Sequence, residues 1–256
     1  MQKELNSKGT SVTELFHDIS FLSVIEVFFY IIIVVILLKS FVLEFYRVES
    51  GSMEPELYKG DIVLVSRIAY FFGFPSRFPL IGTNFGADVR IDYREPKLGD
   101  IIVIDGNEAK NIPEEKFLIK RVVGIPGDTL QIGFNVDFEN IFNLKKNSVN
   151  NYGLEIIIPK SGDKIKIDVN NLKYYLQLLT NEGEKGQALI DSIRNNIFYT
   201  KNFKFDNSYF FVQGDNTLKS LDSRSYGLIP DKAIIGRAVI LLMSSSDQKG
   251  SNLKFL

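Results

Sequence analysis

The sequence predicts a mainly β protein: an antiparallel β core with an inserted α+β region, preceded by one N-terminal transmembrane helix. Short runs rich in β-branched residues follow Gly-Asp pairs at 62–65, 101–104 and 129–132. A Gly-Asp turn that leads into such a run is typical of antiparallel strands. A long apolar run at 19–38 predicts the helix, and a shift to Asn, Lys and Ile at 133–208 marks the insertion.

The apolar run has the length of a membrane span. About 20 apolar helical residues cross the hydrocarbon core of a bilayer. Residues 19–38 are almost wholly apolar, with Ser23 and Glu26 as the main exceptions, and 27–38 has no polar group except the hydroxyl of Tyr30. A cleaved signal peptide is the alternative. The length of the run and the absence of a clearly basic region before it favour a retained anchor. The lysines that precede the run favour a cytoplasmic amino terminus, with the rest of the chain outside.

Composition shifts divide the chain into five expected segments. They are a short N-terminal tail, the anchor, the first part of a catalytic core, the insertion and the second part of the core, with bounds 1–18, 19–38, 39–132, 133–208 and 209–256. Inside the insertion we expect a strand pair, 154–159 with 164–169, and two helical patches, 171–179 and 184–194.

An aromatic stretch between Tyr70 and Arg94 contains Phe71, Phe72, Phe74, Phe78, Leu80 and Ile81. Its default interpretation is core. In a chain tethered to a bilayer, the alternative is an exposed apolar surface that rests on lipid.

The composition excludes several kinds of chemistry. Thirty Lys and Arg residues nearly balance 31 Asp and Glu residues, so charge gives no case for a nucleic-acid partner. The chain has no cysteine and one histidine, His17. Disulfides and thiol catalysis are therefore excluded, and we expect neither a metal nor a cofactor.

A serine motif follows the apolar run, at residues 50–55 (Ser-Gly-Ser-Met-Glu-Pro). A serine hydroxyl is a poor nucleophile until a base takes its proton. Because His17 precedes the membrane run, the candidate base is a lysine, and Lys120 lies in the apolar strand 117–123. Desolvation among aliphatic side chains disfavours the charged amine and lets it act as a base. Taken alone this signal is weak, because a strand lysine usually extends to solvent.

Three motifs in this order behind an anchor resemble the bacterial type I signal peptidases. They are residues 50–55, residues 120–128, and Gly214-Asp215-Asn216 continuing to Ser220-Leu221-Asp222-Ser223-Arg224. Residues 41–48 resemble the segment that follows the membrane helix in that family. The resemblance covers about residues 20–132 and 205–241.

The resemblance implies a role for each matched position. Ser52 is the expected nucleophile and Lys120 the expected general base. Ser50 is expected to form the oxyanion hole with the backbone N–H of Ser52, and Ser220 to orient the lysine. The residues expected to support the loop are Arg121, Asp215, Asp222 and Arg224, with Asp222 and Arg224 as an ion pair and Arg121 nearby. The other interpretation of Asp215 is a simple turn.

Four apolar neighbours of the dyad are the expected substrate-binding residues: Val48, Met53, Leu57 and Ile119. The implied function is a membrane-bound serine endopeptidase that removes signal peptides from secretory preproteins after a small-x-small site. Its expected place is the bacterial cytoplasmic (inner) membrane, in contact with lipid, with the catalytic domain on the extracytoplasmic side.

The chain also departs from the family pattern. Thr217-Leu218-Lys219 stands where Arg-Asp-Asn is common, Ser225-Tyr226 replaces a tyrosine-tryptophan pair, and Glu49 and Glu56 replace a proline and a threonine. These departures leave open a specialised peptidase with a restricted substrate. An inactive homologue that acts as a binding subunit is a further alternative. A self-cleaving repressor-type Ser–Lys protease is the third, but those proteins are soluble.

Overall fold

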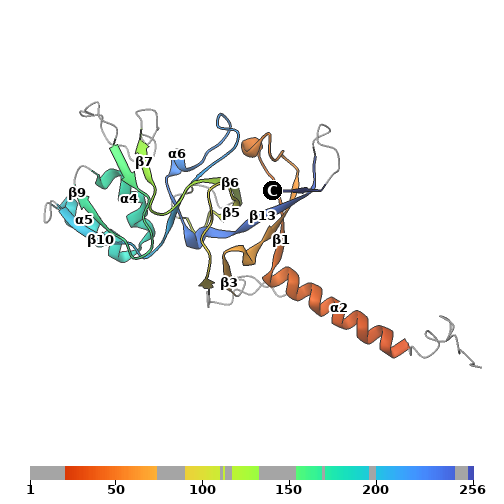
Figure 1. Cartoon of the computed structure of the whole chain (residues 1–256). Coiled ribbons are helices and arrows are strands. Elements are labelled where there is room, and N and C mark those ends of the chain that lie inside the picture. Colours follow the sequence, from red (N-terminus) through yellow and green to blue (C-terminus); the bar gives the residue numbers. More distant parts are fainter. Residues whose placement is uncertain are drawn as a thin grey trace, which may run out of the picture.

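The computed structural model describes residues 21–73, 90–109, 112, 117–132, 154–168, 171–195, 200–245 and 253–256. The mainly antiparallel β fold is confirmed in this part of the chain (Figure 1). Its principal sheet has the strand order β1-β2-β13-β5-β6-β11-β12, and β14 pairs with β13. The strands are β1 (Leu43–Arg47), β2 (Ile62–Ser66), β5 (Ile101–Asp105), β6 (Phe117–Gly124), β11 (Tyr209–Gln213), β12 (Ile229–Pro230), β13 (Ile234–Met243) and β14 (Lys254–Phe255).

The Gly-Asp pairs form turns of one kind. In each, the glycine has a positive φ between 87° and 97°, a conformation that favours glycine. The aspartate that follows accepts a 2.9 Å hydrogen bond from the backbone N–H three residues earlier. Three of these turns start the strands expected from the sequence, and a fourth starts a strand of the insertion; the pairs are Gly60-Asp61, Gly99-Asp100, Gly127-Asp128 and Gly162-Asp163.

The centre of the principal sheet, at β5, is buried on both faces. Successive strand residues point to opposite faces, and β5 accordingly places Ile101 and Val103 in one apolar cluster and Ile102 in another. On β6, Ile119 belongs to the first cluster and Val122 to the second. This two-sided burial explains why the strands appear as continuous apolar runs rather than as an alternating pattern.

The insertion contains the expected helices, but its strands pair differently. Helices α4 (Leu172–Asn181) and α5 (Glu184–Arg194) confirm the two helical patches. Strands β8 (Leu154–Ile157) and β9 (Lys164–Asp168) lie where expected, yet they do not pair with each other. Their partners are β7 and β10, namely Thr129–Ile132 and Thr200–Lys204. The prediction that these two strands pair with each other was wrong. Each of them pairs instead, over at least four positions, with a strand farther away in the sequence.

The aromatic stretch after Tyr70 is described only at its ends. Strand β3 (Phe71–Gly73) pairs with β4 (Arg90–Asp92). Phe71 is buried in the core, whereas Phe72 is 52% exposed. The other aromatic and aliphatic residues of this prediction, Phe74, Phe78, Leu80 and Ile81, lie outside the described residues.

The first described element is the helix α2 (Phe21–Phe41), which projects from the β body in Figure 1. Within the described ranges, no helix meets the requirements of length and apolar character for crossing a membrane. The anchor expected at 19–38 therefore stays a prediction. The tail before it, with His17, lies outside the described residues.

Candidate active site

Ser52 is carried by a short loop that connects β1 to β2. The loop is closed at its base, where Val48 N–H donates to the Asp61 carbonyl and Gly60 N–H donates to the Val48 carbonyl, both at 2.8 Å. Met53 is 1% exposed and fixes the loop to the core beneath it. Ser52 itself lies in a single 3₁₀ turn, Gly51–Met53, and is 5% exposed.

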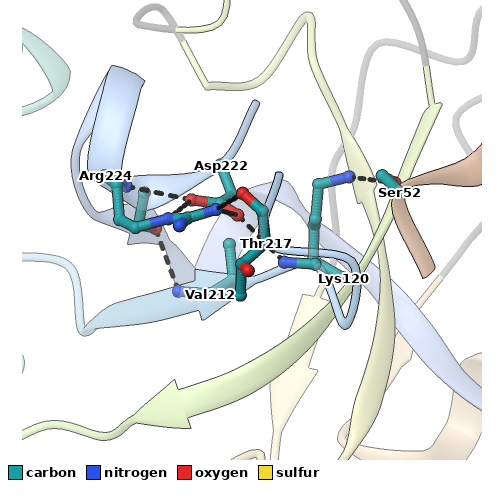
Figure 2. A network of polar contacts seen from close by, with 8 residues as sticks. Ser52, Lys120, Val212, Thr217, Asp222 and Arg224 are labelled. Carbon is teal, nitrogen blue, oxygen red and sulfur yellow. Dashed lines mark hydrogen bonds and ion pairs between the residues drawn. The ribbon is translucent and has the colours of Figure 1, made fainter. Parts of the chain in front are cut away.

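Lys120 reaches this serine from the middle of β6. Its side chain is 3% exposed, and its Nζ lies 2.7 Å from Ser52 Oγ. Figure 2 shows the amino group of Lys120 directed at Ser52. The hydroxyl of Ser50 donates a hydrogen bond to Ser52 Oγ, at an Oγ–Oγ distance of 3.2 Å. The structure thus brings together the expected nucleophile, base and oxyanion-hole serine, which come from two distant parts of the sequence.

Burial changes the acid–base behaviour of Lys120. Desolvation lowers the pKa of its amine to about 8, and the negative charge of Asp222 acts weakly in the opposite direction. A lysine at its ordinary pKa is almost fully charged at neutral pH. At a pKa of about 8, a useful fraction of the amine is neutral and has a lone pair that accepts a proton.

The expected ion pair is present beside the lysine. Arg224 Nε donates to Asp222 Oδ1 at 2.8 Å, and Arg224 Nη2 donates to Asp222 Oδ2 at 2.9 Å. Gly214 N–H donates to Asp222 Oδ2 at 3.0 Å. Burial of Asp222 favours its neutral form, but these hydrogen bonds outweigh it, and the pKa of this carboxyl is lowered. Arg224 also donates to the Thr217 carbonyl (Figure 2). The Asp222–Arg224 ion pair is thereby tied to the loop that precedes it in the sequence.

Arg121 does not join that ion pair. It forms a bidentate contact with Asp215, with Nε to Oδ1 at 2.8 Å and Nη2 to Oδ2 at 2.7 Å. It also donates to the Gly99 carbonyl at 2.9 Å. Asp215 is therefore more than a simple turn residue, because a guanidinium fork fixes it to the strand that carries Lys120.

Ser220 is near the dyad, but its expected hydrogen bond to Lys120 is absent. Within the described part of the chain its Oγ is buried and has no hydrogen-bond partner. The hydroxyl contributes to the lowered pKa of Asp222, although the two groups do not meet hydrogen-bond geometry. A Cβ on Gly214 would collide with Ser220 Oγ and with the Ser52 carbonyl. Glycine at 214 thus lets the two serine segments approach, and the orienting role of Ser220 stays a prediction.

The four expected substrate-binding residues lie in one core cluster below Ser52. Val48 is 3% exposed and Ile119 is 8% exposed, while Met53 and Leu57 are still more deeply buried. They form the apolar floor of the site rather than an open surface. Their contact with substrate stays a prediction.

Two site residues were not expected from the sequence. Asn216 N–H donates to the Ser52 carbonyl at 2.9 Å and so fixes the back of the nucleophile loop. Glu54 accepts hydrogen bonds from Asn216 Nδ2 at 3.4 Å and from Lys219 Nζ at 3.2 Å. Asn216 belongs to a motif that the sequence analysis singled out, but its partner depends on the fold.

Among the strands that the structure describes, none pairs with one side of β6 next to the dyad. Strand β5 pairs with β6 along Phe117–Arg121, whereas the pairing of β11 begins only at Arg121. The rings of Tyr46 on β1 and Phe117 on β6 meet edge to face at 5.2 Å. Strands β1 and β6 therefore approach each other where β6 begins.

Within the described residues, no group of three His, Cys, Asp or Glu side chains is arranged to hold a metal ion. A buried amine within 3 Å of a buried hydroxyl is suited to nucleophilic catalysis at a carbonyl.

Comparison with known proteins identifies the family. The family model described as signal peptidase, peptidase S26, matches residues 21–140 and 154–243. A signal peptidase I of Pseudomonas aeruginosa is 31% identical over 88% of this chain and 74% of its own length. One from Buchnera aphidicola subsp. Baizongia pistaciae is 29% identical over 87% of this chain and 77% of its own.

A signal peptidase I of known structure, from Enterococcus faecalis V583, matches 57% of this chain and 98% of its own at 18% identity. Its TM-score is 0.25, so this likeness carries no argument about the fold. The family model spans most of the sequence, including both segments that form the site. The chain belongs to the S26 signal peptidase family and is a serine endopeptidase.

Proposed function

We propose that this chain removes signal peptides from exported preproteins, with Ser52 as nucleophile and Lys120 as general base. One observation supports this assignment above all. Lys120 Nζ lies 2.7 Å from Ser52 Oγ, and both residues are at most 5% exposed. An inactive homologue that serves as a binding subunit has no chemical need for a buried amine with a depressed pKa at this position.

The geometry suits a two-step acyl transfer. Neutral Lys120 accepts the Ser52 proton as Oγ attacks the scissile carbonyl, and the lysine then passes that proton to the departing amine. The carbonyl oxygen becomes negatively charged, and the Ser52 backbone N–H and the Ser50 hydroxyl are proposed to stabilise it. A water that loses its proton to Lys120 then hydrolyses the ester on Ser52. Lys120 returns that proton to the departing Ser52 Oγ, which frees the new carboxyl group and restores the enzyme.

The open edge of β6 supports an extended substrate. Residues Phe117–Lys120 pair with β5 on one side only, so their other backbone groups are placed to pair with a peptide. An added strand puts alternate side chains towards the enzyme. The apolar floor formed by Val48, Met53, Leu57 and Ile119 leaves little depth below that strand. Small residues one and three positions before the cut fit this arrangement.

The amino-terminal helix supports a membrane location. Its apolar side chains are exposed, including Phe28 at 61% and Ile32 at 55%, and residues 19–38 have the length of a span. The β body begins directly after it, so a membrane-spanning helix would hold Ser52 near the bilayer surface. We propose a single-pass anchor with the catalytic domain on the extracytoplasmic face of a bacterial inner membrane. Protease added to spheroplasts should digest the domain and spare an amino-terminal tag; protection of the domain would contradict this orientation.

Cleavage of a preprotein by the full chain in detergent tests the dyad. Ser52→Ala and Lys120→Arg should each abolish cleavage, because the first lacks the nucleophile and the second stays charged. The matched controls are Ser192→Ala on α5 and Lys160→Arg, since both positions lie on the surface away from the dyad. Normal cleavage by either dyad variant would remove the assignment.

Substrate variants test the specificity. Replacing the residue just before the cut by Phe should reduce cleavage by orders of magnitude relative to Ala, because the floor below the peptide is shallow. Equal cleavage of both preproteins would contradict signal-peptidase specificity even if the dyad assignment holds. Cleavage of one preprotein among many with acceptable sites would favour the specialised peptidase instead.

A further inference from the structure

The insertion contacts both ends of the polypeptide that holds the Ser220 loop, which we define as residues 214–222. Strand β11 leads into this loop, and the single-turn helix α6 (Ser223–Tyr226) leads out of it. The apolar core of the insertion includes Tyr209 at the start of β11 and Leu228 just after α6. One hydrophobic cluster therefore packs against the chain on both sides of the loop.

At the exit of the loop, the contact is made by a buried glutamine of α4. Gln177 is 8% exposed, and its Nε2 donates to the Tyr226 carbonyl at the end of α6. Gly227 follows with a φ of 83°, and a Cβ there would collide with the Gln177 amide. The positive φ favours glycine at this position, and the Gln177 amide reaches the Tyr226 carbonyl beside it.

At the entry of the loop, the end of α4 contacts Tyr209. The tyrosine hydroxyl lies 3.0 Å from two acceptors, the Leu178 carbonyl and Glu182 Oε1, which share its single proton. Glu182 also accepts hydrogen bonds from the backbone N–H groups of Asp206 and Asn207. The carboxylate therefore fixes the turn from which β11 starts, and Tyr209 itself is fully buried.

From α6 these contacts continue to the dyad. Ser223 Oγ accepts a hydrogen bond from Val212 N–H at 2.9 Å, and Asp222 holds Gly214 N–H at 3.0 Å (Figure 2). Asn216, two residues after Gly214, donates to the Ser52 carbonyl. A displacement of α6 would therefore move the groups that surround Ser52 and Lys120.

We infer that Gln177 is a positioning residue for catalysis, which acts from the insertion through α6 on the loop beside the dyad. The inference rests on the proposed function, since it assigns Gln177 to the same reaction. The chain would thus use its insertion to hold the Ser220 loop at the correct distance from Lys120. Tyr209 supports the other end of the loop in the same way.

Steady-state cleavage of a signal peptide by the full chain tests the inference. Gln177→Met keeps the length and volume of the side chain but removes the donor, and it should lower kcat by about tenfold with KM unchanged, because misplacement of supporting groups slows the chemical step. Tyr209→Phe should act in the same direction. The control is Gln187→Met, because Gln187 lies exposed on α5 and bonds only within that helix. Thermal unfolding of each variant establishes that it is folded at the assay temperature.

A double-mutant cycle separates positioning from general destabilisation. Arg224→Met loosens the loop directly, so Gln177→Met should add less than about threefold to that loss. Full multiplication of the two effects would overturn the inference, and so would a kcat for Gln177→Met within about twofold of the unchanged protein. Ser52→Ala, assayed in parallel, distinguishes the failures. Activity in Ser52→Ala would remove the proposed function, whereas loss there with normal Gln177→Met removes only the positioning role.

Discussion

The active site and the insertion bury opposite kinds of side chain. At the site, Ser52, Lys120, Asp222 and Ser223 are buried, with at most 5% exposure each. In the insertion, the core is aliphatic and aromatic, and its buried polar residues Gln177, Asn181 and Ser208 lie where it meets the rest of the chain. Burial at the site therefore serves chemistry and opposes stability, while burial in the insertion supplies stability.

The largest effect should come from Lys120→Met. Activity should fall by about 10,000-fold or more, since the general base is lost. The protein should nevertheless become more stable at neutral pH. Desolvation lowers the pKa of Lys120 to about 8 from 10.5. Protonation of this amine therefore opposes folding in full below about pH 8, and the free energy of unfolding rises as the pH increases from about 8 to 10.5.

The expected gain for Lys120→Met is about 2 kcal/mol at pH 7, after the loss of its hydrogen bond to Ser52 is taken into account. Urea unfolding at pH 7 and pH 10.5 measures it. The gain should shrink as the wild-type lysine becomes neutral. A variant that is less stable than the wild type at pH 7 would contradict the claim that burial of this amine opposes folding.

The converse change in the insertion is Ile167→Ala. Ile167 is fully buried on β9, in the apolar cluster of the insertion. Truncation should reduce the free energy of unfolding by about 3 kcal/mol, because it leaves a cavity. The kcat of the folded fraction should stay within about twofold of the unchanged protein, since β9 makes none of the contacts with the Ser220 loop. A large fall in kcat without loss of stability would break the comparison.

The smallest effect should come from Lys219→Ala. Lys219 pairs with Glu54 beside the nucleophile, but its side chain is 66% exposed. Exposed ion pairs contribute about 0–1 kcal/mol, so the melting temperature and kcat should barely change. A tenfold loss of kcat would show that position near the dyad matters more than burial, contrary to the comparison drawn above.

The sequence predicted local features better than partnerships. Strands β2, β5 and β7 follow Gly-Asp turns whose geometry depends on a few adjacent residues, and they lie where expected. The pairing predicted between β8 and β9 was wrong, because strand pairing depends on segments far away in the sequence. The anchor, the segment boundaries and the roles of the site residues stay predictions.

The site shows the same division. The motifs indicated Ser52 and Lys120 together, and the fold brings them within 2.7 Å. The partner of Arg121 could not be read from the motifs, since it depends on how β11 aligns with β6. That alignment places Gln213 opposite Arg121 and includes an irregularity between Phe211 and Val212, so Asp215 falls within reach of the guanidinium.

The dependence of kcat/KM on pH tests the central claim most directly, namely that a buried lysine is the base. Activity with a preprotein should rise with pH along a single acid limb with an apparent pKa near 8, the lowered value of Lys120. It should be the same in a His17→Gln variant, because the histidine has no part in the reaction. A limb near pH 6.5 that disappears with His17→Gln, or one near the ordinary pKa of lysine, would contradict the account.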